Sequence, residues 1–118
     1  MLTSSKPRPL NSHWAAMKEF DEHLHDACAA WRDALTYNGI IPMREKEMMM
    51  IAMACLIRFE AGVRTHVRYA LDEGVTRDEI FAAASLSMLL GGIPAFRDGI
   101  LWIKDELAKL DAAEQGGK

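Results

Sequence analysis

Ten consecutive apolar residues, Met48 to Ile57, constrain the fold of this 118-residue chain more than any other feature. The run carries no charge and lacks the apolar and polar alternation that a half-buried strand shows. A helix that is apolar on every side lies at the centre of a helical assembly, where neighbours cover it all round. The run holds four methionines, at 48, 49, 50 and 53. Flexible thioethers suit such a position because they fill irregular gaps between helices.

Apolar residues recur every three or four positions through most of the remaining chain, which predicts an all-α fold of about five helices. Ser12 is a plausible N-cap for the first helix, Asn38 and Gly39 supply its end, and Thr76 with Glu79 form a capping box. The expected helices run from Ser12 to a stop at Asn38 and Gly39, from a first turn at Pro42 through the apolar run, from about Val63 to Gly74, from about Arg77 to Leu90, and from Pro94 to about Leu110. We expect one helical domain over residues 12–112, a flexible lead-in over 1–11 and a frayed tail over 113–118.

Composition and charge exclude several classes of function. The net charge of −3 comes without a basic run, so nucleic acid is not an expected partner. The longest apolar run falls short of the roughly 20 residues that a membrane-spanning helix needs. The polar start of the chain lacks the apolar middle of a signal peptide, and we therefore expect a cytoplasmic protein. Half of the residues are apolar, which indicates a further buried surface such as a subunit interface.

The cysteines and the N-terminal histidines favour structural readings over chemical ones. Cys28 and Cys55 are far apart and lie in apolar helical stripes, so inert core positions are favoured over a redox pair. His23 and His25 are two positions apart and point in different directions, which favours a solvated face over a metal site. We expect neither a metal nor another cofactor.

Two ionisable residues, Glu47 and His66, fall within apolar stripes and are therefore predicted to point toward an interior. A buried carboxylate or imidazole without a partner is costly, and the simplest resolution is that the two meet. They could then act as an acid and base pair, with the carboxylate orienting the imidazole. A bend between Arg58 and Gly62 is required, and its arms are unequal, roughly 16 and 9 Å. Contact therefore needs an oblique crossing or a partner residue from another subunit.

A structural alternative fits the same pattern. In it, His66 is a core histidine bonded to a backbone carbonyl, and Glu47 is an exposed first-turn residue favoured by the helix dipole. Spacing gives no support for a nucleophilic triad, because it places no cysteine or serine beside a histidine.

The chain resembles the carboxymuconolactone decarboxylase family, which includes the alkylhydroperoxidase AhpD-like proteins, over about residues 40 to 106. The resemblance rests on Glu47, the long apolar helix, the break, His66 and the segment Gly91-Gly92-Ile93-Pro94-Ala95. In the peroxidase branch a glutamate and eleven residues precede C-x-x-C-x-x-x-H. Here Phe59 and Gly62 occupy the two cysteine positions. Without that dithiol a peroxidase activity is disfavoured, whereas the decarboxylase branch lacks the cysteines and keeps the histidine.

The resemblance implies a homotrimer or homohexamer and a cofactor-free lyase that removes CO₂ from a small carboxylated lactone in aromatic-acid catabolism. His66 would be the acid that protonates carbon and Glu47 its orienting partner. Arg58, Arg64 and Arg97 are candidates for holding the anionic groups of the substrate, and spacing singles out none of them. The alternative is a non-redox helical oligomer with a binding or accessory role.

Overall fold

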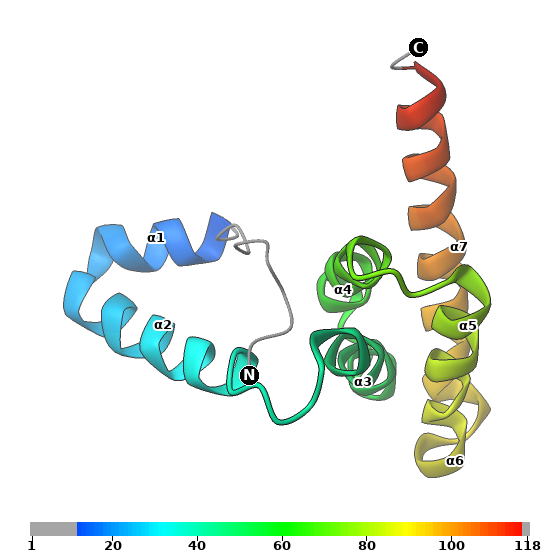
Figure 1. The fold of residues 1–118 in the computed structure, drawn as a ribbon, viewed down its shortest axis with the longest axis horizontal. Coiled ribbons are helices and arrows are strands. Elements are labelled where there is room, and N and C mark those ends of the chain that lie inside the picture. The colour runs from blue at the N-terminus through cyan, green and yellow to red at the C-terminus, as the bar shows by residue number, and fades with distance from the viewer. Residues whose placement is uncertain (1–11, 117–118) are drawn as a thin grey trace. The chain divides into compact units, whose positions relative to one another are not determined.

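A computed structural model describes residues 12–116, which form seven α-helices and no strand, and this confirms the all-α fold class (Figure 1). The helices are α1 (Ser12–Phe20), α2 (Glu22–Thr36), α3 (Met43–Leu56), α4 (Glu60–Asp72), α5 (Arg77–Ser85), α6 (Ser87–Gly91) and α7 (Ile93–Gly116). The expected lead-in lies outside the described residues. The described part of the expected tail continues α7 to Gly116. The expected single domain over 12–112 stays a prediction.

The first of two compact units contains α1 and α2, which pack side by side as a hairpin (Figure 1). We expected one helix here, and that prediction was wrong because Asp21 breaks it. The Asp21 backbone is extended (φ −157°, ψ 95°), and its side chain accepts a hydrogen bond from the Leu24 N–H at 3.0 Å. An aspartate that caps in this way competes with the continuous helix. The end of α2 follows the prediction, with Gly39 at positive φ.

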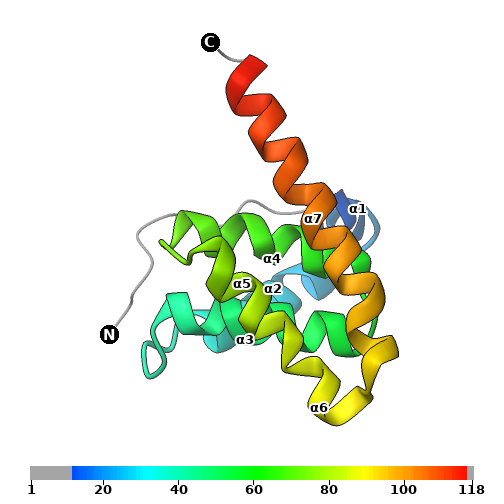
Figure 2. The same cartoon turned by 90° about the vertical axis from the view of Figure 1, so that its right-hand side faces the viewer.

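The second unit begins at Arg44 and contains most of α3 and the helices that follow it. In this unit α7 packs across α4 and along α5 and α6 (Figure 2). Its buried core consists of aliphatic and small side chains with one aromatic, namely Ile51, Ala54, Cys55, Val63, Val67, Ala70, Val75, Ile80, Ala84, Phe96 and Ile103. The central position predicted for the run from Met48 to Ile57 is thus confirmed for Ile51, Ala54 and Cys55. Met49, Met53 and Ile57 are exposed instead.

A tight turn at residues 57–59 joins α3 to α4. The Phe59 N–H donates to the Ala54 carbonyl at 2.9 Å, and the Arg58 N–H donates to the Cys55 carbonyl at 3.1 Å. This is a Schellman motif, which needs a left-handed residue and usually has glycine there. Arg58 takes that conformation with φ 57°. The predicted bend is therefore real, although Gly62 lies inside α4 and takes no part in it.

Helix α5 begins with the predicted capping box. Thr76 Oγ1 accepts from the Glu79 N–H at 3.1 Å, and Glu79 Oε1 accepts from the Thr76 N–H at 2.9 Å. Glu79 also binds Arg44 of α3. The expected helix over 77–90 is divided at Leu86 into α5 and α6. At the break the Leu86 N–H donates to the Ala83 carbonyl, and Ser87 Oγ donates to the Ala84 carbonyl. The bond to Arg44, followed by that to the Thr76 N–H, lowers the pKa of Glu79 to about 2.

This carboxylate is expected to make the stability of the fold depend on pH. Because the folded pKa of Glu79 is depressed, its contribution is present above the usual pKa near 4.5 and is lost as pH falls toward 2. Glu79→Gln should lower the melting temperature at pH 7, and its deficit relative to the unmodified protein should shrink between pH 4.5 and pH 2. Circular dichroism melts at a series of pH values measure this deficit. Glu19→Gln, at an exposed position of α1, is the control. A deficit in the melting temperature of Glu79→Gln that is equal at pH 7 and at pH 2 would contradict the prediction.

Candidate functional site

Glu47 and His66 meet within one chain. His66 Nδ1 lies 2.6 Å from Glu47 Oε1, and the two residues come from successive helices, α3 and α4. The turn at Arg58 folds α4 back against α3 and brings together two positions that are 19 residues apart. No second subunit is needed for this contact. The catalytic role of the pair stays a prediction.

The two side chains of the pair differ in their exposure to solvent, and the two ring nitrogens of His66 differ in their partners. Glu47 is 1% exposed, whereas the His66 side chain is 25% exposed. When Glu47 is ionised its carboxylate only accepts hydrogen bonds, and Nδ1 of His66 is then the donor in this contact. Nε2 makes no hydrogen bond within the described residues and is the nitrogen left for another molecule. The alternative of an exposed Glu47 and a carbonyl-bonded His66 is therefore not the observed geometry.

Tyr69 extends the site, and α3 buries a second ionisable residue next to Glu47 in the sequence; the sequence pattern missed both. The ring of Tyr69 meets that of His66 edge to face, with 5.8 Å between centroids. Lys46 is 8% exposed beside Glu47 in α3, so two neighbouring ionisable residues of this helix are buried. Lys46 lies three residues after Met43 and four before Met50. That helical spacing was the signal that could have placed Lys46 on the buried face.

The candidate anion-holding arginines are not gathered at His66. Arg64 binds Glu60 at 2.9 Å, Asp105 at 2.7 Å and Glu106 at 3.3 Å, and these contacts raise its pKa. Two residues apart, Arg64 and His66 point about 200° apart around α4, so Arg64 faces α7 instead. Asp98 of α7 is the partner of the other two candidates, at 3.9 Å from Arg58 and at 3.5 Å from Arg97.

Both cysteines are free, and the predicted core position is confirmed for Cys55, whereas Cys28 is half-buried. Cys55 is fully buried, and burial raises the pKa of its thiol to about 11. It packs against Gly99 of α7, where a Cβ would come within 2.5 Å of its Sγ. A buried thiol with a raised pKa is a poor nucleophile, which supports the inert reading of Cys55.

The prediction of a solvated face for both N-terminal histidines was wrong for His25, although His23 is exposed. His25 is 6% exposed and packs edge to face on Trp14 of α1, and its Nδ1 lies 3.0 Å from Asp26. Within residues 12–116 no three His, Cys, Asp or Glu side chains are grouped as a metal site. None of the helices in this range is long and apolar enough to cross a membrane.

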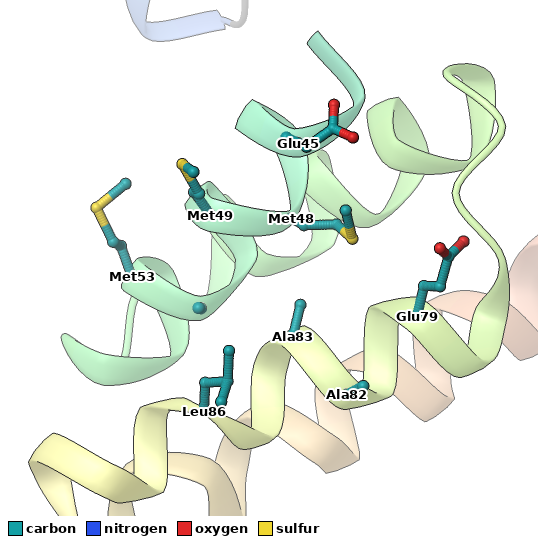
Figure 3. A pocket seen from close by; sticks show the side chains of 9 residues that line it. Glu45, Met48, Met49, Met53, Glu79, Ala82, Ala83 and Leu86 are labelled. Atoms are coloured by element: carbon teal, nitrogen blue, oxygen red, sulfur yellow. The ribbon is translucent and has the colours of Figure 1, made fainter. Parts of the chain in front are cut away.

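An apolar groove of about 680 Å³ lies on a different part of the second unit, between α3 and α5 (Figure 3). Its walls are mostly methionine, alanine and leucine side chains, among them Met48, Met49, Met53, Ala82, Ala83 and Leu86. Glu45 and Glu79 line it as well, and Oε2 of Glu45 is shielded from solvent and has no hydrogen-bond partner among residues 12–116. Glu47 and His66 are not among the lining residues. The groove and the Glu47–His66 pair are therefore separate features of the second unit.

The class defined by these observations is an all-helical protein with a buried glutamate bonded to a half-exposed histidine and with no cysteine pair between them. The model of the carboxymuconolactone decarboxylase family matches residues 22–105, and the chain belongs to this family. A search of curated proteins finds no match.

Two solved structures share the fold. One is a candidate carboxymuconolactone decarboxylase from Burkholderia xenovorans LB400, with a TM-score of 0.73 and 18% identity, covering 88% of this chain and 84% of that one. The other is a protein of Thermotoga maritima, with a TM-score of 0.62 and 21% identity, covering 87% of this chain and 99% of that one. At these identities the likeness establishes the AhpD-like helical fold and confirms the predicted architecture, while the match to the family model confirms the predicted family.

Proposed function

We propose that this protein is a cofactor-free carboxy-lyase of the carboxymuconolactone decarboxylase type, acting in the cytoplasm on a small carboxylated lactone or related acid from aromatic catabolism. The observation that carries the proposal is the 2.6 Å contact between Glu47 and His66, with the carboxylate buried and the imidazole partly open. Membership of the decarboxylase family supports the reaction class.

The proposed chemistry needs one proton and a place for one electron pair. The bond between the substrate carbon and its carboxylate breaks, CO₂ leaves, and the electron pair stays on the substrate and delocalises into the lactone. His66 in its imidazolium form then donates the Nε2 proton to carbon, and the neutral imidazole is reprotonated from water. Glu47 holds the ring through Nδ1 and stabilises the imidazolium that precedes each transfer.

The proposal is tested by incubating the purified protein with carboxymuconolactone and measuring CO₂ release together with the change in the substrate's ultraviolet absorbance. Stoichiometric CO₂ at a rate well above that without protein supports a lyase. Absence of turnover over a panel of carboxylated lactones and keto acids would contradict it. That result would favour the second candidate, a helical oligomer with a binding or accessory role.

Self-association is the second part of the proposal, as a homotrimer or homohexamer. Its support is the amount of apolar surface that one chain leaves exposed. Large apolar side chains more than half exposed lie on several helices and turns of the second unit, including Ile57, Leu86, Leu89, Leu90, Ile93 and Leu101. Exposed apolar surface of this extent is typical of interfaces. Sedimentation equilibrium gives the subunit number, and a monomer at micromolar concentration would contradict this part.

A further inference from the structure

We propose that Phe59 is a substrate-specificity residue, whose ring forms a platform beside His66 that favours planar over puckered rings. This inference rests on the proposed function for the identity of the substrate, and it concerns a residue to which the acid and base chemistry assigns no role.

The first observation is how the Phe59 ring lies. Phe59 is the residue before α4, and its ring covers Gly62 in the first turn of that helix. A Cβ at Gly62 would come within 2.5 Å of Phe59 Cδ2 and 2.9 Å of Cε2. Only glycine therefore admits the ring in this position. Phe59 remains 53% exposed, so the ring is packed on its helix side and open elsewhere.

The second observation is the position of the ring relative to the imidazole. Gly62 and His66 are four residues apart and lie on one face of α4, and the Phe59 ring reaches this face by covering Gly62. Gly62 and His66 are separated by about 6 Å of helix rise, or roughly one turn. A ring that covers Gly62 therefore lies about one helical turn from the imidazole. A small cyclic acid that contacts the phenyl ring can place a substituent at His66.

The third observation is that this turn is built from locally unfavourable residues. Phe59 makes no side-chain hydrogen bond to the start of α4, where Ser, Thr, Asp or Asn would be favoured. Gly62 occupies a helical position that favours alanine. Arg58 takes a left-handed conformation with φ 57°. Helix α5, by contrast, has a complete capping box. Unfavourable choices of this kind, concentrated beside ionisable residues, indicate a functional requirement.

The chemistry of the ligand follows from the phenyl face. An unsaturated lactone is a flat ring that can stack on a phenyl ring in an offset arrangement, whereas a saturated ring of the same size is puckered and makes fewer close contacts. Aromatic pairs contribute beyond their buried area, which corresponds to a preference of about fivefold in the dissociation constant. The expected ligand class is therefore a planar cyclic carboxylate.

Binding of benzoate and cyclohexanecarboxylate tests the platform without requiring turnover. These acids carry the same carboxylate on rings of equal size, one flat and one puckered. NMR titrations that follow the backbone amide of Gly62 give both dissociation constants. We expect the unmodified protein to prefer benzoate about fivefold and Phe59→Ala to show a ratio near one. Phe59→Leu, which keeps apolar bulk, and Gly62→Ala, which displaces the ring, should also reduce the ratio.

Two controls separate this inference from the proposed function. Phe81→Ala removes another half-exposed aromatic ring, on α5, and should keep the preference for benzoate. His66→Gln should weaken the binding of both acids alike and so keep their ratio, because benzoate and cyclohexanecarboxylate carry the same carboxylate. A preference that survives in Phe59→Ala, or equal or undetectable binding of both acids by the unmodified protein, would overturn the platform even if His66 proves catalytic. Loss of the preference in a protein that lacks lyase activity would support the platform while the proposed function fails.

Discussion

Replacing His66 with Gln is expected to lower kcat for carboxymuconolactone by about 10²- to 10⁴-fold, the usual contribution of a positioned acid or base. Glutamine retains a polar side chain of similar size but has no proton to deliver to carbon. Because His66 is partly exposed and lies at the edge of the core, the variant should stay folded. Initial rates of CO₂ release, measured beside far-ultraviolet circular dichroism, test this result.

The matched control is His23→Gln, which changes an exposed histidine of α2 by the same chemistry. It should retain the full rate. Turnover by His66→Gln within threefold of the unmodified enzyme would remove His66 from the mechanism and would leave the contact with Glu47 as a structural feature.

Replacing Glu47 with Gln is the second change with a large expected effect. Within residues 12–116 Glu47 is the one hydrogen-bond partner of His66, and it is almost fully buried. Carboxylates that hold a catalytic histidine in one tautomer contribute up to about 10⁴-fold in kcat in well-studied hydrolases. An amide carries no negative charge to stabilise the imidazolium, and by donating to Nδ1 it holds the ring in the neutral form, whose Nε2–H is a much weaker acid. We expect kcat to fall by about 10²-fold or more with little change in KM.

Two further variants test whether Glu47 acts through His66. Glu45→Gln, two positions earlier in α3, alters a residue of the apolar groove and should leave the rate unchanged. The double variant of Glu47 and His66 should be no slower than His66→Gln alone, because residues that act as one unit are not additive. Multiplicative losses in the double variant would show that Glu47 acts independently of His66.

The sequence was sufficient for the fold class and the family, and it indicated the pairing of Glu47 with His66 as one of two interpretations. Apolar periodicity indicated the helices because one face of each must be buried, and an ionisable residue on such a face needs a partner. Local signals were reliable where a short motif specifies one geometry, as the capping box at Thr76 does. They were less reliable at Asp21 and Leu86, where the same apolar stripe continues through a break in the helix.

The remaining features depend on contacts that periodicity does not contain. Lys46 is buried because of how α3 packs, and Arg64 is tied to three acidic residues on two helices. The ring of Phe59 covers Gly62 only because the turn at Arg58 directs it there. In the sequence, Phe59 and Gly62 were distinguished only as replacements for two cysteines. Their mutual packing required the structure.

The central claim is that Glu47 fixes His66 with the proton on Nδ1 and leaves Nε2 for the substrate. Nitrogen-15 NMR of the histidine side chains, with the His66 signals assigned through His66→Gln, measures this directly. At a pH where the ring is neutral, the account predicts that Nδ1 is protonated and Nε2 is bare, and that Glu47→Gln changes this balance. A His66 ring protonated on Nε2, or a tautomer that Glu47→Gln leaves unchanged, would contradict the account.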